Sequence, residues 1–195
     1  MAFNDTIRNQ NALYSFSMID GEKDIIERAI KGEAEAFGLL YDSYQPQIYR
    51  FIYLKVSHRE EAEDLTHQVF LNAWQKINNY AFRGFPFSSW LYQIARNQVI
   101  DHYRVKKIVI NIEEDDVADT KTETVADLID KNLGVEKIRT IIGRLNPSHQ
   151  DVIILRFIED FSPKETAQIL GRSETAVKLL QHRAIKNLKK ILNVS

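Results

Sequence analysis

Residues 162–192 read SPKETAQILGRSETAVKLLQHRAIKNLKKIL and contain the start and stop signals of two consecutive helices. Ser162 and Glu165 form a capping-box pattern with Pro163 at the first helical position, which predicts the start of a short helix. Gly171 can adopt the left-handed backbone conformation that ends such a helix. A short helix, a glycine turn and a longer helix are typical of a helix-turn-helix. This stretch therefore predicts a helix-turn-helix near the C-terminal end of the chain.

The second helix of this motif has an excess of positive charge. Ser173 can cap it, and its expected buried residues are spaced three and four apart: Val177, Leu180, Ala184 and Leu188. In a helix-turn-helix the N-terminal end of the second helix enters the major groove. The expected groove-facing residues are Glu174, Thr175, Lys178, Gln181 and His182, with Arg172, Arg183 and Lys186 nearer the phosphates. A helical hairpin with a solvated basic face fits the same pattern, but the segregation of positive charge favours DNA binding.

A second stretch, FRGFPFSSWLYQIARNQVIDHYRVKK at 82–107, combines aromatic and basic residues. Ser88 is a candidate N-cap for a helix that runs to about Tyr103. One face of this helix carries groups that suit base edges and phosphates: Gln93, Arg96, Asn97, Asp101 and Arg104. We expect the opposite face to pack against the core.

The loop before this helix contains Tyr80, Phe82 and Phe85 together with Arg83. Aromatic faces beside a cation suit unstacked single-stranded bases, or a base turned out of a duplex. Phe87 and Trp90 flank the expected helix start, where a hydrophobic staple is common, so we expect these two in the core. For the other three aromatics, a structural role and a single-strand role remain equally open on residue type alone.

Composition favours an all-α protein. The 195 residues include only seven glycines and four prolines, and no cysteine, which removes disulfides and thiolate metal sites. The first twenty residues contain no unbroken apolar run, so we expect neither a signal peptide nor a membrane anchor, and a cytoplasmic location. A net charge of −1 is compatible with nucleic-acid binding where the charges are segregated.

The distribution of charge and periodicity indicates two small helical domains joined by an acidic flexible linker. The segment 108–134 is rich in Asp and Glu and lacks clear periodicity, which is typical of a linker. The expected organisation is an N-terminal extension at 1–23, a helical bundle at 24–107, the linker at 108–134, and the helix-turn-helix domain at 135–195.

Enzymatic function is not favoured. The five histidines are scattered, and neither an HExxH motif nor a glycine-rich phosphate loop occurs. We therefore expect no catalytic residues, no metal and no cofactor.

Three blocks in order give a specific resemblance. EAEDLTHQVFLNAW at 61–74, FSSWLYQIARNQVIDHYR at 87–104 and the block from Leu145 to Ala184 resemble the extracytoplasmic-function (ECF) group of the sigma-70 family. These proteins are the promoter-specificity subunits of bacterial RNA polymerase. The similarity covers roughly 24–107 and 138–192. Three blocks in the expected order and at the expected separations are a specific signal, although each block alone would be weak.

The resemblance implies partners and roles. In the family, the block with Asp64, Leu65, Gln68, Phe70 and Trp74 docks on the clamp helices of the polymerase β′ subunit. The loop from Tyr80 to Phe87 matches the one that captures a flipped base of the minus-ten element. Asn97, Asp101 and Arg104 match positions on the helix beside that DNA. Residues 172–183, Ser173 among them, match the minus-35 recognition helix.

The resemblance also implies a wider setting. The acidic linker stands where the family threads an extended segment along the polymerase interior, and its charge mimics nucleic acid in a basic channel. The expected partners are core RNA polymerase, through its β′ clamp helices and β subunit, and promoter DNA, with the free chain a monomer. Many family members are held inactive by an anti-sigma protein, but nothing in this sequence identifies one.

Two positions depart from the family pattern. The docking block usually reads Gln then Glu where this chain has His67 and Gln68, so one expected carboxylate is absent. The recognition helix usually has small polar and Arg residues where this one has Leu179 and Leu180. We expect Leu180 to take the core position, which would turn Gln181 outward.

A stand-alone helix-turn-helix regulator is the alternative function. It explains the C-terminal motif but leaves the aromatic loop and the docking block without a role. Co-purification with core polymerase separates the two possibilities.

Overall fold

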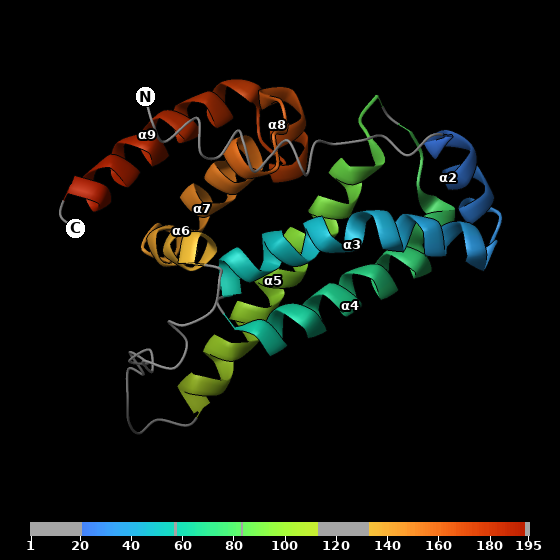
Figure 1. Cartoon of the computed structure of the whole chain (residues 1–195), viewed down its shortest axis with the longest axis horizontal. Coiled ribbons are helices and arrows are strands. Elements are labelled where there is room, and N and C mark those ends of the chain that lie inside the picture. Colours follow the sequence, from blue (N-terminus) through green and yellow to red (C-terminus); the bar gives the residue numbers. More distant parts are fainter. Residues whose placement is uncertain (1–20, 57, 83, 113–132, 194–195) are drawn as a thin grey trace.

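The computed structural model describes residues 21–56, 58–82, 84–112 and 133–193. Within these ranges the regular elements are all helical (Figure 1), which confirms the all-α fold class. In the same ranges, no helix combines the length and the apolar character needed to span a bilayer.

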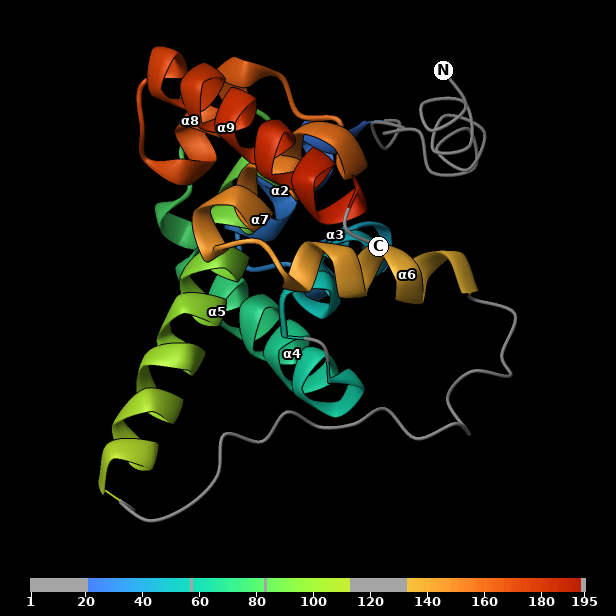
Figure 2. The same ribbon diagram turned by 90° about the vertical axis from the view of Figure 1, so that its left-hand side faces the viewer.

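The N-terminal half is a helical bundle in which α3 packs against α2, α4 and α5. Its apolar residues repeat at helical spacing, and Leu40, Ile48 and Phe51 are completely buried. Figure 2 shows the C-terminal turns of the last helix extending beyond this bundle. The elements are α2 (Glu22–Ile30), α3 (Ala34–Val56), α4 (Arg59–Lys76), the 3₁₀ turn η1 (Ile77–Asn79) and α5 (Phe87–Ile112).

The start of α5 differs from the expectation. The helix begins at Phe87, so Ser88 lies inside its first turn and is fully buried instead of serving as the N-cap. The Ser89 N–H donates to the Pro86 carbonyl at 3.0 Å, which closes the first turn. The sequence signal was misleading because a serine before an apolar run also fits a tightly packed helix start.

The C-terminal half contains the expected helix-turn-helix. The Ser162 hydroxyl accepts from the Glu165 N–H at 3.2 Å, and the Glu165 carboxylate accepts from the Ser162 N–H at 2.8 Å. Gly171 takes the left-handed conformation with φ 62°, and the Ser173 hydroxyl accepts from the Ala176 N–H at 3.2 Å. The elements are α6 (Leu133–Gly143), α7 (Pro147–Ile153), the π-helical turn η3 (Ile154–Ile158), α8 (Pro163–Leu170) and α9 (Glu174–Asn193).

The two halves pack directly against each other, a contact that the tethered-domain expectation did not include. Tyr92 of α5 is fully buried, and its ring meets Phe161 edge-on with centroids 4.8 Å apart. Burial and the neighbouring Glu159 carboxylate raise the pKa of the Tyr92 hydroxyl well above its ordinary value. α8 therefore lies against α5, and this contact positions the site described below.

The capping box gives a stability prediction. Ser162→Ala removes the hydroxyl that satisfies an otherwise unpaired amide of α8, so we expect the free energy of unfolding to fall by about 1 kcal/mol. Urea denaturation followed by circular dichroism measures the change. Thr140→Ala, which removes a hydroxyl from an exposed position of α6, is the matched control, and an equal effect of both substitutions would contradict the capping role.

Candidate nucleic-acid interface

The polar face of α5 lies opposite its buried side, as expected. Leu91, Ala95 and Val99 are buried in the core. Because these residues recur at helical spacing, the groups between them are turned away from the bundle. The polar side chains are half-buried at Gln93 and Arg96 and exposed at Asn97, Asp101 and Arg104.

A cavity of about 240 Å³ lies between the aromatic loop and the first turns of α5. Tyr80, Phe85 and Trp90 give it aromatic walls, and Ser89 and Gln93 add polar groups. Gln168 of α8 contributes a wall from the C-terminal half. Aromatic walls with a few polar groups are typical of sites that take planar rings.

The loop is supported by aromatic packing. The Tyr80 ring meets Phe87 edge-on and lies tilted against Trp90, with centroid separations of 5.2 Å in both cases. Phe87 belongs to the core, as expected, and Trp90 packs against the core while it lines the cavity. Phe82 remains 74% exposed. Arg83, the cation expected here, lies outside the described residues.

Ser89 was not among the expected site residues. It lines the cavity and is 1% exposed, and its hydroxyl has no hydrogen-bond partner within the described part of the chain. An unpaired buried hydroxyl is unfavourable unless a ligand or water satisfies it. The sequence signal was the pair Ser88-Ser89 next to the aromatic loop, which we interpreted only as a helix start.

The C-terminal half contacts Gln93 of the polar face of α5 and two of the expected minus-ten residues, Arg96 and Phe85. The Gln93 side-chain amide donates to the Gln168 carbonyl at 2.6 Å, and Arg96 Nε donates to Asp151 at 2.9 Å. The Lys164 ammonium lies 5.6 Å from the centroid of the Phe85 ring. By contrast, Asn97, Asp101 and Arg104 are exposed along the rest of the face.

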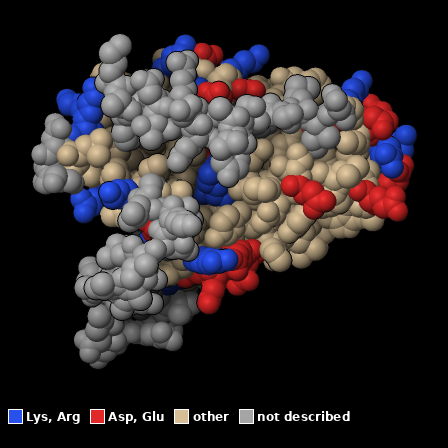
Figure 3. Space-filling model, in the orientation of Figure 1, with Lys and Arg blue, Asp and Glu red and all other residues tan. Residues whose placement is uncertain are grey.

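The expected recognition residues are brought together on α9 and the turn before it. Arg172, Thr175, His182 and Arg183 are exposed, as is the pair formed by Lys178 and Glu174 at 2.8 Å. The Lys178 ammonium, which donates a hydrogen bond to Glu174, lowers the pKa of that carboxyl below its ordinary value. Ser173 is exposed while its hydroxyl caps α9. In Figure 3 Lys and Arg side chains gather at the left of the molecule, over α9.

Leu180 takes the core position, as expected, but Gln181 does not turn fully outward. Leu180 packs against the core, while Leu179 is 50% exposed. The Gln181 side-chain oxygen accepts from Arg156 Nε at 3.1 Å, which holds Gln181 half-buried against η3. This pairing joins residues 25 positions apart, so helical spacing alone could not indicate it.

The expected docking block on α4 has a buried and an exposed part. Leu65 and Phe70 are buried, and the Phe70 ring packs on Tyr41 at a centroid distance of 4.7 Å. These two residues therefore form core contacts instead of an open docking surface. Trp74 is half-buried against Phe37. The exposed face of α4 includes Asp64, His67, Gln68 and Leu71.

Leu71 is an exposed apolar residue of α4 that the resemblance did not indicate. It is 50% exposed and lies one helical turn after His67 and Gln68, so its spacing from these residues could have identified it.

Comparison with known proteins agrees with this geometry. The family model for Sigma-70 region 2 matches residues 40–108, and the model for Sigma-70, region 4 matches residues 141–190. The ECF RNA polymerase sigma factor SigW of Bacillus subtilis is 32% identical over 181 residues, which cover 87% of this chain and 96% of SigW. The ECF RNA polymerase sigma factor BldN of Streptomyces coelicolor is 37% identical over 171 residues, which cover 87% of this chain and 65% of BldN.

A solved structure shares the fold. The sigma factor RpoE, in a co-crystal structure with the anti-sigma factor NepR from Bartonella quintana, matches with a TM-score of 0.69 at 22% identity, covering 83% of this chain and 99% of RpoE. Region 2 corresponds to the bundle that carries the aromatic loop, and region 4 to the helix-turn-helix. The chain therefore belongs to the ECF group of the sigma-70 family, the RNA polymerase sigma factors that initiate transcription.

Proposed function

We propose that the two halves of this sigma factor divide promoter recognition between them. The N-terminal unit, 24–107, binds core polymerase and the unwound minus-ten strand. The C-terminal unit, 135–195, reads the minus-35 element as intact duplex. The acidic segment between the end of α5 at Ile112 and the start of α6 at Leu133 connects them and follows the polymerase interior, where its charge suits a basic channel.

The cavity beside the aromatic loop is the observation that best supports the minus-ten role. Its aromatic walls can stack a base, and the Ser89 hydroxyl and Gln93 amide can hydrogen-bond to base edges. The exposed Phe82 ring offers a second stacking surface outside the cavity. Along α5, the exposed Asn97 and Arg104 would continue the contact toward the strand's phosphates.

The exposed residues of α9 support the minus-35 role. Thr175, Lys178 and His182 lie on the N-terminal half of the helix, which is the part that enters the major groove in this motif. Arg172 and Arg183 would contact phosphates and position the helix. Since Gln181 is held by Arg156, we assign it to supporting the helix and not to direct base contact.

The exposed face of α4 supports the polymerase contact. Sigma factors bind core RNA polymerase and promoter DNA, and α4 presents Asp64, Gln68 and Leu71 together on one side. The exposed leucine would supply the apolar centre of the contact, and the polar groups beside it would supply the rim. We assign Leu65 and Phe70 to packing that fixes the orientation of this face, with Trp74 at its edge.

Transcription with core polymerase tests the whole proposal. Run-off synthesis over a promoter library, with the purified chain added to core enzyme, should give RNA that starts at defined sites. If the chain is instead a stand-alone regulator, it should bind DNA, fail to co-purify with polymerase and give no RNA that starts at defined sites.

Removal of the Phe82 ring tests the loop. Because this ring packs little against the core, Phe82→Ala should leave the fold intact and lower open-complex formation about 5- to 100-fold, the value of one base–aromatic stack. Permanganate reactivity of unpaired thymines in the holoenzyme–promoter complex measures it. Phe157→Ala, which removes a partly exposed ring outside the loop, should have little effect. Equal activity of both variants would remove the loop from the proposal.

Substitution of Arg183 tests the duplex contact. Arg183→Ala should weaken binding to double-stranded DNA and lower the slope of log K against log salt by about one, as expected for one lost phosphate contact. Fluorescence anisotropy with a labelled duplex across a salt series gives the slope. Lys23→Ala removes a cation from the far, exposed α2 and serves as the control. An unchanged slope for Arg183→Ala would contradict a phosphate contact at this position.

Leu71 tests the polymerase contact. Leu71→Ala should weaken binding to core enzyme about 5- to 30-fold, corresponding to about 1–2 kcal/mol for a side chain at an interface centre. Titration of labelled core polymerase measures the affinity. Leu39→Ala, an equally exposed leucine on α3, is the matched control. If the two variants bind core enzyme equally well, the docking face lies elsewhere.

A further inference from the structure

Glu22, the first residue of α2, places a carboxylate inside the N-terminal bundle. Glu22 is only 8% exposed, and its carboxylate accepts a hydrogen bond from the hydroxyl of Tyr44, a buried residue of α3. Burial, and then the hydrogen bond to Glu22, raise the pKa of the Tyr44 hydroxyl above its ordinary value, so this group keeps the proton that it donates. The partial positive charge at the start of a helix also favours a carboxylate at this position.

The packing of α2 does not by itself require this carboxylate. α2 packs against α3 and against η1, the short turn that leads into the aromatic loop. Ile25 and Ala29 are buried on its inner face and supply its apolar contact. An apolar side chain in place of Glu22 would avoid the desolvation of a charge. A buried polar pair specifies one geometry more than it adds net stability, so we looked for the geometry that Glu22 and Tyr44 determine.

Tyr44 connects Glu22 to the aromatic walls of the cavity. The Tyr44 ring lies tilted against Phe87, with the centroids 5.7 Å apart. Phe87 in turn meets Tyr80 at 5.2 Å and Trp90 at 5.3 Å, and both of these residues line the cavity. Burial, and to a smaller extent the charge of Glu22, raise the pKa of the Tyr80 hydroxyl. Two rings, those of Tyr44 and Phe87, therefore join Glu22 to the walls.

The position of these rings matters for a ligand that stacks. Aromatic rings attract each other over a narrow range of separations and orientations, so a displaced wall stacks poorly. A site whose walls are fixed before binding also loses less conformational entropy when its ligand enters. Packing restrains the faces of the Tyr44 ring, and the hydrogen bond to Glu22 fixes its far end.

We propose that Glu22 is a positioning residue for the minus-ten site, which holds the aromatic walls of the cavity, through Tyr44 and Phe87, in the geometry that a captured base requires. Glu22 does not touch the base. α2 lies before residues 40–108, the range that matches Sigma-70 region 2, so this match gives Glu22 no role. The inference rests on the proposed function for the identity of the ligand, whereas the contacts that hold the walls do not depend on it.

The fluorescence of Trp90 tests the walls without DNA or polymerase. The chain has two tryptophans, so Trp74→Phe leaves Trp90 as the only one. In this background Glu22→Ala should shift the Trp90 emission to longer wavelength and increase its quenching by acrylamide, because released rings admit water to the cavity. The matched control is Glu27→Ala, which removes the same side chain from an exposed position of the same helix. Equal emission and quenching of the two variants would overturn the proposal.

Strand binding tests the consequence for the site. Holoenzyme with each variant is titrated with a fluorescent single strand from upstream of a start site mapped by run-off synthesis, and with copies that lack one base each. Removal of the captured base should weaken binding about 5- to 100-fold for the Glu27→Ala control, the value of one base–aromatic stack. Glu22→Ala should reduce this penalty about fivefold, since its walls no longer stack the base. An equal penalty in both variants would overturn the positioning role.

The unaltered chain separates this proposal from the proposed function. If removal of no single base weakens binding by its holoenzyme, the result counts against the aromatic loop as the minus-ten site. The Trp90 comparison still decides whether Glu22 holds the walls, because it uses neither DNA nor polymerase.

Two further variants separate positioning from stability. Glu22→Gln keeps an oxygen that accepts from the Tyr44 hydroxyl, so it should retain the Trp90 emission and the base-removal penalty of the control. Glu22→Ala combined with Tyr44→Phe removes both partners of the hydrogen bond, which should recover the urea midpoint that Glu22→Ala loses. The penalty should nevertheless stay low, because the ring at position 44 is no longer held at its far end. This double variant carries the test if Glu22→Ala loses its helical circular dichroism. Recovery of the penalty together with the midpoint would assign Glu22 a purely structural role and overturn the proposal.

Discussion

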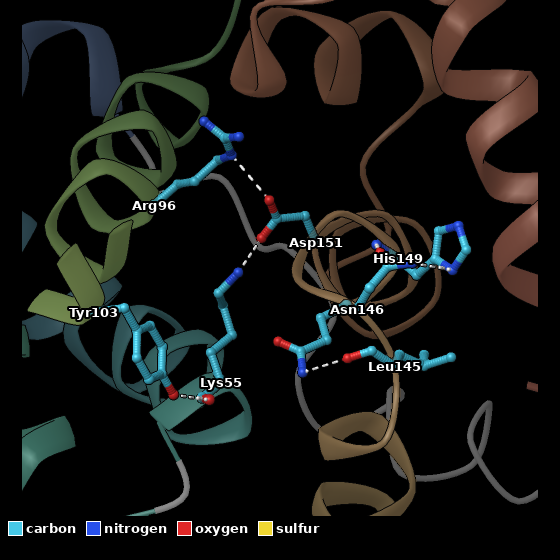
Figure 4. A network of polar contacts seen from close by, with 8 residues as sticks. Lys55, Arg96, Tyr103, Leu145, Asn146, His149 and Asp151 are labelled. Atoms are coloured by element: carbon cyan, nitrogen blue, oxygen red, sulfur yellow. Dashed lines mark hydrogen bonds and ion pairs between the residues drawn. The ribbon is translucent and has the colours of Figure 1, made fainter. Parts of the chain in front are cut away.

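The packing of the two halves depends on charges that are satisfied only when both halves are in place. Lys55, Asp151 and Glu159 are almost fully buried, and each finds its partner across the contact, as Figure 4 shows for Lys55 and Asp151. A charge removed from water without a partner is strongly unfavourable, so the geometry of this contact is tightly specified even where its net contribution to stability is small. These buried ion pairs therefore determine the relative orientation of the two halves more than the free energy of their association.

α5 is the element on which these constraints converge. Its first turns line the cavity, its middle meets Asp151 and Phe161, and its last turns extend beyond the bundle (Figure 2). Gln168 of the C-terminal half lines the cavity and accepts, through its main-chain carbonyl, the hydrogen bond that the Gln93 side chain of α5 donates. The cavity and the contact between the halves are thus parts of one arrangement.

The sequence was informative where the determining signal is local. Ser162, Glu165 and Gly171 indicate the helix-turn-helix, because caps and turns depend on residues only three to nine positions apart. The polar face of α5 follows from helical periodicity in the same way. The pairing of Arg96 with Asp151 joins residues 55 positions apart and depends on the fold as a whole. Local patterns also could not tell that Ser89 lines a cavity, since the type and spacing of this residue do not fix its surroundings.

The π-helical turn η3 makes the length of one short segment matter as much as its composition. An α-helix advances about 100° per residue, so one additional residue in a turn changes the azimuth of every side chain that follows. At the end of η3 this offset aligns the Glu159 carboxylate with Arg50 and Tyr92. A substitution at the partly exposed Phe157 leaves the number of residues in η3, and therefore the direction of the Glu159 side chain, unchanged. Loss of a single residue from 154–158 would rotate the Glu159 carboxylate out of alignment with its partners. Homologous chains with a shorter segment here would need a different way of joining their halves.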